Sequence, residues 1–191
     1  MNKHIFDPDK RKRLNNPERL RWMPPYKIWD FVQPNNAKVV VDIGAGTGYI
    51  TKALAMYYPA TVFLALDIEP IMVEEMNQSL VPNANVIPKL IEPYKIPLQD
   101  DFADMVMGIN VYHEFDDAKK MLKEIHRVLR PHGKLLIVDW DKSHESCEQG
   151  PIFEHRISKE DAVKDLASVN FHTIKTTTDF QYHYAISASK S

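Results

Sequence analysis

The stretch Val39-Val-Val-Asp-Ile-Gly-Ala-Gly-Thr-Gly-Tyr-Ile50 decides the fold class of this chain of 191 residues. Its apolar, β-branched beginning, from Lys38 to Ile43, predicts a buried strand. That strand runs directly into Gly44, Gly46 and Gly48, and glycines at such a turn allow a ligand to approach the bare backbone closely. A helix is expected to follow. Together these features predict one strand–turn–helix unit of an α/β sheet, with a ligand at the turn.

Strand and helix patterns go on alternating along the chain. We expect helices over 47–58, 72–80 and 115–129, strands over 61–66, 85–87, 102–109, 134–140, 171–176 and 181–187, and a helix start at Ser158-Lys-Glu-Asp161. The short link Thr177-Thr178-Asp179 suits an antiparallel hairpin and is too short for a helical crossover. The pattern therefore predicts an open α/β sheet that is largely parallel, with one antiparallel strand.

The composition indicates one globular domain. The chain is 44% hydrophobic, which argues against intrinsic disorder, and its single cysteine, Cys147, excludes a disulfide scaffold. No apolar run approaches the roughly 20 residues of a membrane helix, and the N-terminus lacks the apolar core of a secretion signal. A pI near 6.4 argues against general binding to nucleic acid. We expect a soluble, cytoplasmic, single domain over 1–191, with a helical lid segment (1–33) on a Rossmann-like core (34–191).

Two cofactor classes use a glycine turn of this kind. Dinucleotide-binding proteins use G-x-G-x-x-G, but here the position of the third glycine is Tyr49. Asp42 would place negative charge beside a pyrophosphate, whereas it suits S-adenosylmethionine (SAM), which carries an ammonium and a sulfonium and no phosphate. Asp67, at the end of the second strand, is placed to accept hydrogen bonds from ribose hydroxyls. SAM is therefore the expected cofactor. The alternative is a NAD-type oxidoreductase.

Four segments resemble motifs of the class I SAM-dependent methyltransferases. These are Asp42-Ile-Gly-Ala-Gly-Thr-Gly48, Ala65-Leu-Asp-Ile-Glu69, Pro97-Leu-Gln-Asp-Asp-Phe-Ala-Asp-Met-Val106 and Leu129-Arg-Pro-His-Gly-Lys-Leu-Leu-Ile-Val-Asp139. The nearest subgroup is the type 11, ubiquinone/menaquinone-methyltransferase-like enzymes. The resemblance implies an α/β, Rossmann-like, seven-stranded mixed sheet with order 3-2-1-4-5-7-6, strand 7 antiparallel, and helices on both faces. It also implies methyl transfer from SAM.

The glycine turn and the resemblance together give a set of cofactor-binding residues. The resemblance implies that Asp67 holds the ribose, Ile68 packs on the adenine and Glu92 contacts the adenine amino group. Glu92 departs from the family pattern, because its surroundings, Ile91-Glu-Pro-Tyr94, lack the usual G-D-A. The full expected set is Asp42, Gly44, Ala45, Gly46, Gly48, Asp67, Ile68, Glu92 and Asn110.

The methyl acceptor is expected beyond the fourth strand, where the resemblance places residues 110–114 near the reactive methyl. His113 is the best general-base candidate, because its ordinary pKa lies near neutral pH; Tyr112 is a second candidate. Further residues that could line an acceptor pocket or a lid are Asp139, Trp140, Asp141, Glu154, His155, Arg156, Trp22, Tyr26 and Trp29. No zinc-binding spacing is present, so no metal is expected. We expect a small-molecule acceptor and no nucleic acid; a homodimer and a non-catalytic SAM-binding protein remain open.

Overall fold

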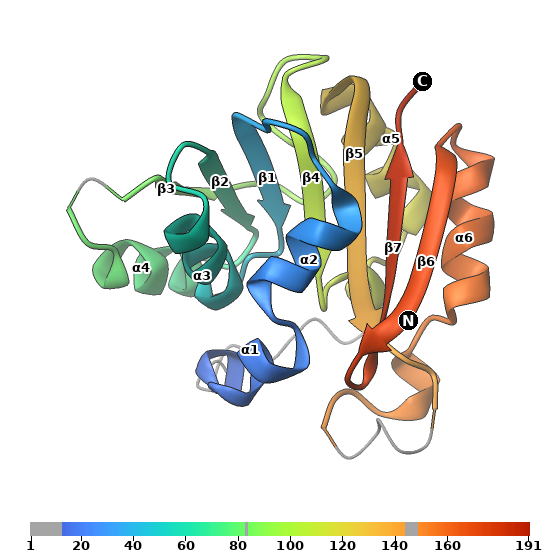
Figure 1. Cartoon of the computed structure of the whole chain (residues 1–191), viewed down its shortest axis with the longest axis horizontal. Coiled ribbons are helices and arrows are strands. Elements are labelled where there is room, and N and C mark those ends of the chain that lie inside the picture. The colour runs from blue at the N-terminus through green and yellow to red at the C-terminus, as the bar shows by residue number, and fades with distance from the viewer. Residues whose placement is uncertain (1–12, 83, 144–148) are drawn as a thin grey trace.

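Seven strands form one sheet in the order β3-β2-β1-β4-β5-β7-β6 (Figure 1). The computed structural model describes residues 13–82, 84–143 and 149–191. The strands are β1 (Val39–Ile43), β2 (Val62–Asp67), β3 (Val86–Leu90), β4 (Ala103–Ile109), β5 (Leu129–Trp140), β6 (His172–Phe180) and β7 (His183–Ser189). The β7 strand is antiparallel to both of its neighbours, and the other pairings are parallel. The expected strand order is confirmed.

Helices cover both faces of the sheet. They are α1 (Glu18–Trp22), α2 (Pro25–Val32), α3 (Tyr49–Tyr57), α4 (Pro70–Ser79), α5 (Ala118–Val128) and α6 (Lys159–Ser168). The α2 helix lies in front of the sheet in Figure 1. None of the helices in the described ranges is long and apolar enough to cross a bilayer.

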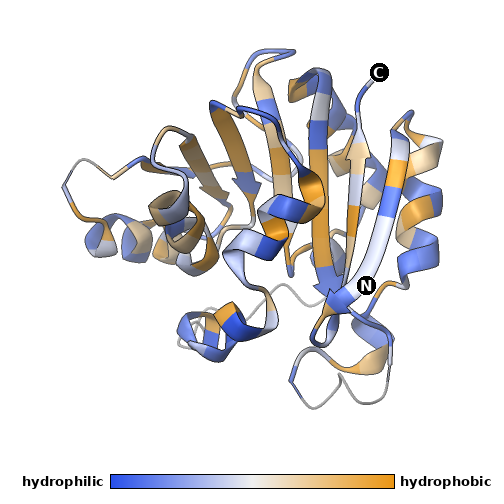
Figure 2. Ribbon diagram, in the orientation of Figure 1, coloured by the Kyte–Doolittle hydropathy of each residue, from blue (hydrophilic) through white to orange (hydrophobic). Residues whose placement is uncertain are grey.

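The alternation of side chains along each strand divides the interior into two cores. In β1, Val40 packs with buried residues of α2, α3 and α4, whereas its neighbour Val41 packs with those of α5 and α6. This follows from the two-residue period of a strand, which sends successive side chains to opposite faces. Figure 2 shows the resulting pattern, with apolar strands at the centre and polar surfaces on the outer helices. Both faces of the sheet are therefore buried at its central strands, whereas the edge strands β3 and β6 are largely exposed.

The expected starts of α5 and β5 differ from the structure. The α5 helix begins at Ala118, not at 115, because the Asp117 side chain accepts the Lys120 N–H and caps it. The β5 strand starts at Leu129 and passes through Pro131-His-Gly133, which the sequence suggested as a break before a strand at 134; the register shift between Ala103 and Met105 of β4 absorbs the irregularity.

The hairpin link expected at Thr177–Asp179 is wrong. These residues belong to β6, in keeping with the strand preference of β-branched threonine. The turn is formed instead by Gln181 and Tyr182, and Tyr182 takes a left-handed conformation with φ of 66°. By contrast, the helix start at Ser158 is confirmed, because its hydroxyl accepts the Asp161 N–H at 3.1 Å.

The N-terminal aromatic residues pack on the core. Trp29 stacks on Tyr58 with ring centroids 3.8 Å apart, and Trp22 meets Tyr182 edge-on at 5.4 Å. Tyr26 is half exposed. None of the three lines the cleft described below. The basic residues before Arg13, and Cys147, lie outside the described residues.

Acid is expected to weaken the fold through His183. Burial lowers the pKa of His183 to about 4, against a partly compensating hydrogen bond to the Gln181 carbonyl. In the unfolded chain His183 is protonated near pH 6.5, whereas in the folded chain it is protonated only near pH 4. The free energy of unfolding therefore decreases as the pH falls from about 6.5 to 4. Urea unfolding of wild type and His183→Gln between pH 7 and 4 should show about 3 kcal/mol more acid loss for wild type. Parallel profiles would contradict this.

Candidate functional site

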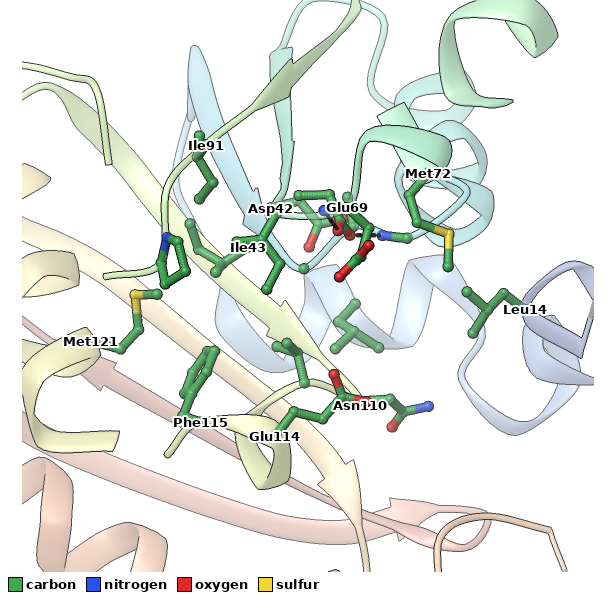
Figure 3. Close-up of a pocket in the computed structure, with 18 of the residues that line it drawn as sticks. Leu14, Asp42, Ile43, Glu69, Met72, Ile91, Asn110, Glu114, Phe115 and Met121 are labelled. Carbon is green, nitrogen blue, oxygen red and sulfur yellow. Dashed lines mark hydrogen bonds between the residues drawn. The ribbon is translucent and has the colours of Figure 1, made fainter. Parts of the chain in front are cut away.

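A cleft lies at the carboxyl ends of β1, β2 and β4 (Figure 3). The β1 strand pairs with β2 on one side and with β4 on the other, so the chain order of the strands reverses here. Ligands of open α/β sheets bind at such a switch point. The polar residues that line the cleft are Arg19, Asp42, Asp67, Glu69, Tyr94, Asn110, Glu114 and Asp116.

The glycine turn leaves backbone, not side chains, on the cleft wall. Gly44 and Gly46 have φ values of 65° and 57°, in the left-handed region that favours glycine. A Cβ on Gly44 would stand 2.4 Å from Val111 Cγ2, and one on Gly46 would stand 2.9 Å from Leu14 Cδ1. Gly44, Ala45 and Gly46 line the cleft; Gly48 begins α3 and packs against Met76 outside it. The turn is therefore a cradle that a side chain would fill.

Asp67 ties the end of β2 to the glycine turn. Its Oδ2 accepts the Gly46 N–H at 2.7 Å, and its Oδ1 accepts the Glu69 N–H at 2.9 Å. Burial raises the pKa of Asp67, and these backbone hydrogen bonds oppose that effect. A carboxylate offers about four acceptor positions, so two bonds leave capacity for ligand hydroxyls on the cleft side.

Asp42 brings a second buried carboxyl group to the cleft. It accepts a hydrogen bond from the Thr51 hydroxyl. Burial raises the pKa of Asp42 to about 7, and the nearby Asp67 raises it further, whereas Thr51 and Arg19 act against the increase. Two buried acids so close together favour a cation beside them, because an opposite charge stabilises the ionised form.

Asn110 holds a polar atom without a partner. It follows β4 with φ of 59°, and its backbone N–H donates to the Val138 carbonyl at 2.8 Å. Its buried Oδ1 has no hydrogen-bond partner in the described chain. Buried polar atoms are nearly always satisfied, so an acceptor left open on the cleft wall fits a ligand that donates a hydrogen bond. Figure 3 shows Asn110 on the side of the cleft near Leu14.

The opposite end of the cleft is apolar. Ile68, Ile91, Pro93, Phe115 and Met121 line it. Glu92 does not: its side chain is 75% exposed and pairs with Lys95 at 3.4 Å. The flat, apolar part of a ligand fits this end, and the backbone turn of 91–94 carries Glu92 outward.

Tyr112 and His113, the two candidate bases, lie in the 3-10 turn Tyr112–Glu114. Neither lines the cleft, whose wall is formed here by Val111 and Glu114. The Tyr112 hydroxyl donates to Asp165 Oδ2 at 3.0 Å, on the α6 side. His113 is nearly buried; its Nδ1 lies 2.8 Å from Asp139 Oδ1, and its Nε2 lies 3.8 Å from Glu114 Oε1. His113 therefore stands directly behind a cleft residue.

The described residues of the loop after β5 make contacts within the fold and do not line the cleft. Arg156 is buried and donates to the Asp141 and Pro151 carbonyls at 2.7 and 2.9 Å. His155 ends the 3-10 turn Phe153–His155, and neither residue lines the cleft. The sequence predicts that both could line an acceptor pocket, and neither reaches this cleft.

Comparison with known proteins identifies the family. The family model of the type 11 methyltransferase domain matches residues 41–137, which is more than half of the chain. The chain belongs to this family. Its members' methyl donor is SAM, and the match covers the glycine turn, the end of β2 and the residues after β4.

Similar proteins agree with this assignment. An uncharacterised methyltransferase of Mycobacterium bovis is 34% identical over 128 residues, covering 67% of this chain and 50% of the relative. A SAM-dependent methyltransferase of Aquifex aeolicus has a TM-score of 0.89 at 26% identity, covering 98% of this chain and 100% of that one. A putative methyltransferase of Haloferax volcanii, solved with the Trm112 methyltransferase activator, shares the fold (TM-score 0.76, 18% identity, 98% and 99% covered). The chain spans about half of the length of the first curated relatives it matches.

The cleft of this methyltransferase domain fits SAM. The glycine cradle leaves room for close approach, and the open acceptor on Asn110 suits the ammonium of the methionine part. The carboxylate of Asp67 suits the ribose hydroxyls, and the apolar end suits the adenine.

Removal of the Asp67 carboxylate should weaken cofactor binding. Asp67→Ala is expected to cost about 2–4 kcal/mol of binding free energy, because hydrogen bonds to a charged group contribute about 1.5–3 kcal/mol each and are not additive. Asp67→Asn should lose less, since one acceptor oxygen remains. Calorimetry with S-adenosylhomocysteine, the demethylated cofactor, measures both. An Asp67→Ala protein that binds like wild type would exclude Asp67 from the cofactor site.

Proposed function

We propose that this protein transfers a methyl group from SAM to a small organic acceptor, and that His113 takes up the proton the acceptor loses. The observation that carries the proposal is the pairing of His113 with a buried acid beside the cleft. Asp139 Oδ1 lies 2.8 Å from His113 Nδ1, and Asp139 Oδ2 accepts the His113 backbone N–H at 3.0 Å. Asp139 is 1% exposed.

This pairing fixes the role of each imidazole nitrogen. With Nδ1–H donating to Asp139, Nε2 is the nitrogen left to accept a proton. Burial lowers the pKa of His113, but the charge and hydrogen bond of Asp139 outweigh it, so the pKa lies above its ordinary value. The same contact outweighs burial at Asp139 and holds its pKa low. The pair thus forms a base whose orientation is set by a permanent negative charge.

The bound cofactor supplies an electrophilic methyl group. The chain's own residues then have three tasks. Asp67 and the glycine turn orient the cofactor, Phe115 and the apolar end of the cleft exclude water, and His113 takes up the proton that the acceptor loses. Glu114 stands between His113 and the cleft, with 3.8 Å between His113 Nε2 and Glu114 Oε1. The acceptor is therefore expected beside Glu114, and its proton is expected to pass through the Glu114 carboxylate to His113 Nε2. Tyr112 is left out of this scheme, because burial and Asp165 raise its pKa.

A small acceptor is favoured over a nucleic acid. The chain has a net charge of -2, and the acids Glu69, Glu114 and Asp116 line the cleft. A phosphate backbone would be repelled at this rim, because nucleic-acid binding depends on neutralising phosphates with cations.

Transfer of a labelled methyl group tests the proposal. Wild type is incubated with methyl-labelled SAM and either a small-metabolite extract or total RNA, and the label is counted in each fraction. Label in a metabolite supports the proposal. Label in RNA would contradict it and show that the acceptor is a nucleic acid. Binding of S-adenosylhomocysteine with no transfer to any fraction would identify a non-catalytic SAM-binding protein. The Gly46→Val variant, which is expected not to bind the cofactor, serves as the control.

A further inference from the structure

Arg19 brings a cation to the cofactor cleft from outside the region that matches the family model. It belongs to the short α1 helix and lines the cleft with Asp42 and the glycine turn. Its Nη1 donates to the Leu14 carbonyl at 2.6 Å. Burial lowers the pKa of Arg19 to about 10, and the negative charge of Asp42 partly offsets this. A guanidinium has five N–H donors, so one bond leaves most of its capacity for a ligand.

The segment before α1 is attached to the glycine turn, which fixes where Arg19 stands. The Thr47 hydroxyl donates to Asn15 Oδ1 at 2.6 Å, and Asn15 Nδ2 donates to Glu75 at 3.0 Å. Leu14 Cδ1 sits 2.9 Å from the position that a Cβ on Gly46 would take. Figure 3 shows Leu14 at the side of the cleft where Met72 and Asn110 also lie. Arg19 is therefore held at the end of the cleft away from the apolar adenine pocket.

The methionine part of the cofactor is best bound with a cationic side chain nearby, at the end of the cleft where Leu14 and Asn110 lie (Figure 3). The methionine part of SAM carries both an ammonium and a carboxylate. Asp42 and the open Oδ1 of Asn110 suit the ammonium, but a carboxylate needs donors of opposite charge. Arg19 is the one Lys, Arg or His side chain in the described lining of the cleft. We propose that Arg19 binds the carboxylate of the methionine part, so that the N-terminal segment completes the cofactor site.

The proposal rests on SAM as the cofactor but not on an acceptor or on His113, so it is tested by binding alone. Arg19→Met keeps much of the apolar stem and removes the charge. Arg21→Met is the matched control, because Arg21 lies on the same helix, is 78% exposed and pairs with Glu18. Three probes are compared by calorimetry: S-adenosylhomocysteine, its decarboxylated analogue, and methylthioadenosine, which lacks the whole amino-acid end.

Arg19→Met should weaken S-adenosylhomocysteine binding about 10- to 100-fold, the range expected for hydrogen bonds between charged groups. The decarboxylated analogue and methylthioadenosine should bind wild type and Arg19→Met equally. Arg21→Met should bind all three probes as wild type does. Asp42→Asn should weaken the decarboxylated analogue, which keeps the ammonium, more than it weakens methylthioadenosine.

Two results would overturn the proposal. An equal loss for all three probes would mean that Arg19 only holds the N-terminal segment in place, and no loss for any probe would mean that it does not contact the ligand. Circular dichroism melting checks the fold of each variant. If Arg19→Met does not fold, Arg19→Lys takes its place, and the same selective loss for the probe with a carboxylate is required. Wild type that binds none of the probes would instead refute SAM as the cofactor.

Discussion

Gly46→Val is expected to remove measurable binding of S-adenosylhomocysteine while the protein still folds. The added side chain would occupy the cradle that the cofactor approaches, and its first atom would stand 2.9 Å from Leu14 Cδ1. A β-branched residue also resists the φ of 57° found here. The strain should cost about 1–3 kcal/mol of stability, which lowers the melting temperature without unfolding the domain.

Calorimetry and thermal melting separate these two effects of Gly46→Val. The double variant Leu14→Ala/Gly46→Val is the matched control, because it removes the clash with Leu14 but leaves the side chain in the cradle. It should recover part of the melting temperature and none of the binding. Cofactor affinity equal to that of wild type in either variant would show that the glycine turn does not face the ligand.

His113→Asn is expected to lower turnover about 10²–10⁴-fold, the usual contribution of a general base. The asparagine amide can donate to Asp139 as Nδ1–H does, so the variant keeps this contact and loses only Nε2. Binding of S-adenosylhomocysteine should stay within about twofold of wild type, since His113 does not line the cleft. The measurement is single-turnover methyl transfer to the acceptor identified with labelled SAM.

The pH profile distinguishes a base from a structural histidine. The base form exists only above the pKa of His113, which Asp139 raises. The logarithm of the wild-type rate should therefore rise with unit slope and level off at a pH above the ordinary histidine pKa. Asp139→Asn removes the charge and should move the bend to lower pH. An unchanged bend in Asp139→Asn would assign the titration to another group and exclude His113 as the base.

The fold was predictable because its signals are local. The glycine turn after Val39–Ile43, the acid at the end of β2 and the short connection between the last two strands each follow from neighbouring residues, and together they define the sheet. The position of the hairpin turn was not predictable in this way. The turn residues Gln181 and Tyr182 are neither glycine nor proline, so they give no turn signal. The pairing of β6 with β7 sets the position of the turn instead.

The two ends of the cleft differ in how much the sequence discloses. Asp42 and Asp67 stand at the carboxyl ends of β1 and β2, and Asn110 directly follows β4, so topology alone brings them together. Arg19 gave no such signal, because nothing in the sequence distinguishes it from Arg21. Only the contacts of the segment before α1 with the glycine turn direct Arg19 toward the cleft. Tyr112 and His113 illustrate the same limit, since neighbours in one 3-10 turn point to opposite partners, Asp165 and Asp139.

The place of β7 in the sheet has a consequence for synthesis of the protein. It lies between β5 and β6, yet the ribosome makes it after both. Until residues 183–189 have emerged, β5 is an open edge strand, with Leu136 and Val138 on it and its backbone hydrogen bonds to β7 unmade. Such edges recruit other chains. The interval between translation of β5 and docking of the β6–β7 hairpin is therefore when this chain most needs protection from aggregation, and substitutions that slow the hairpin should reduce the yield of folded protein more than its final stability.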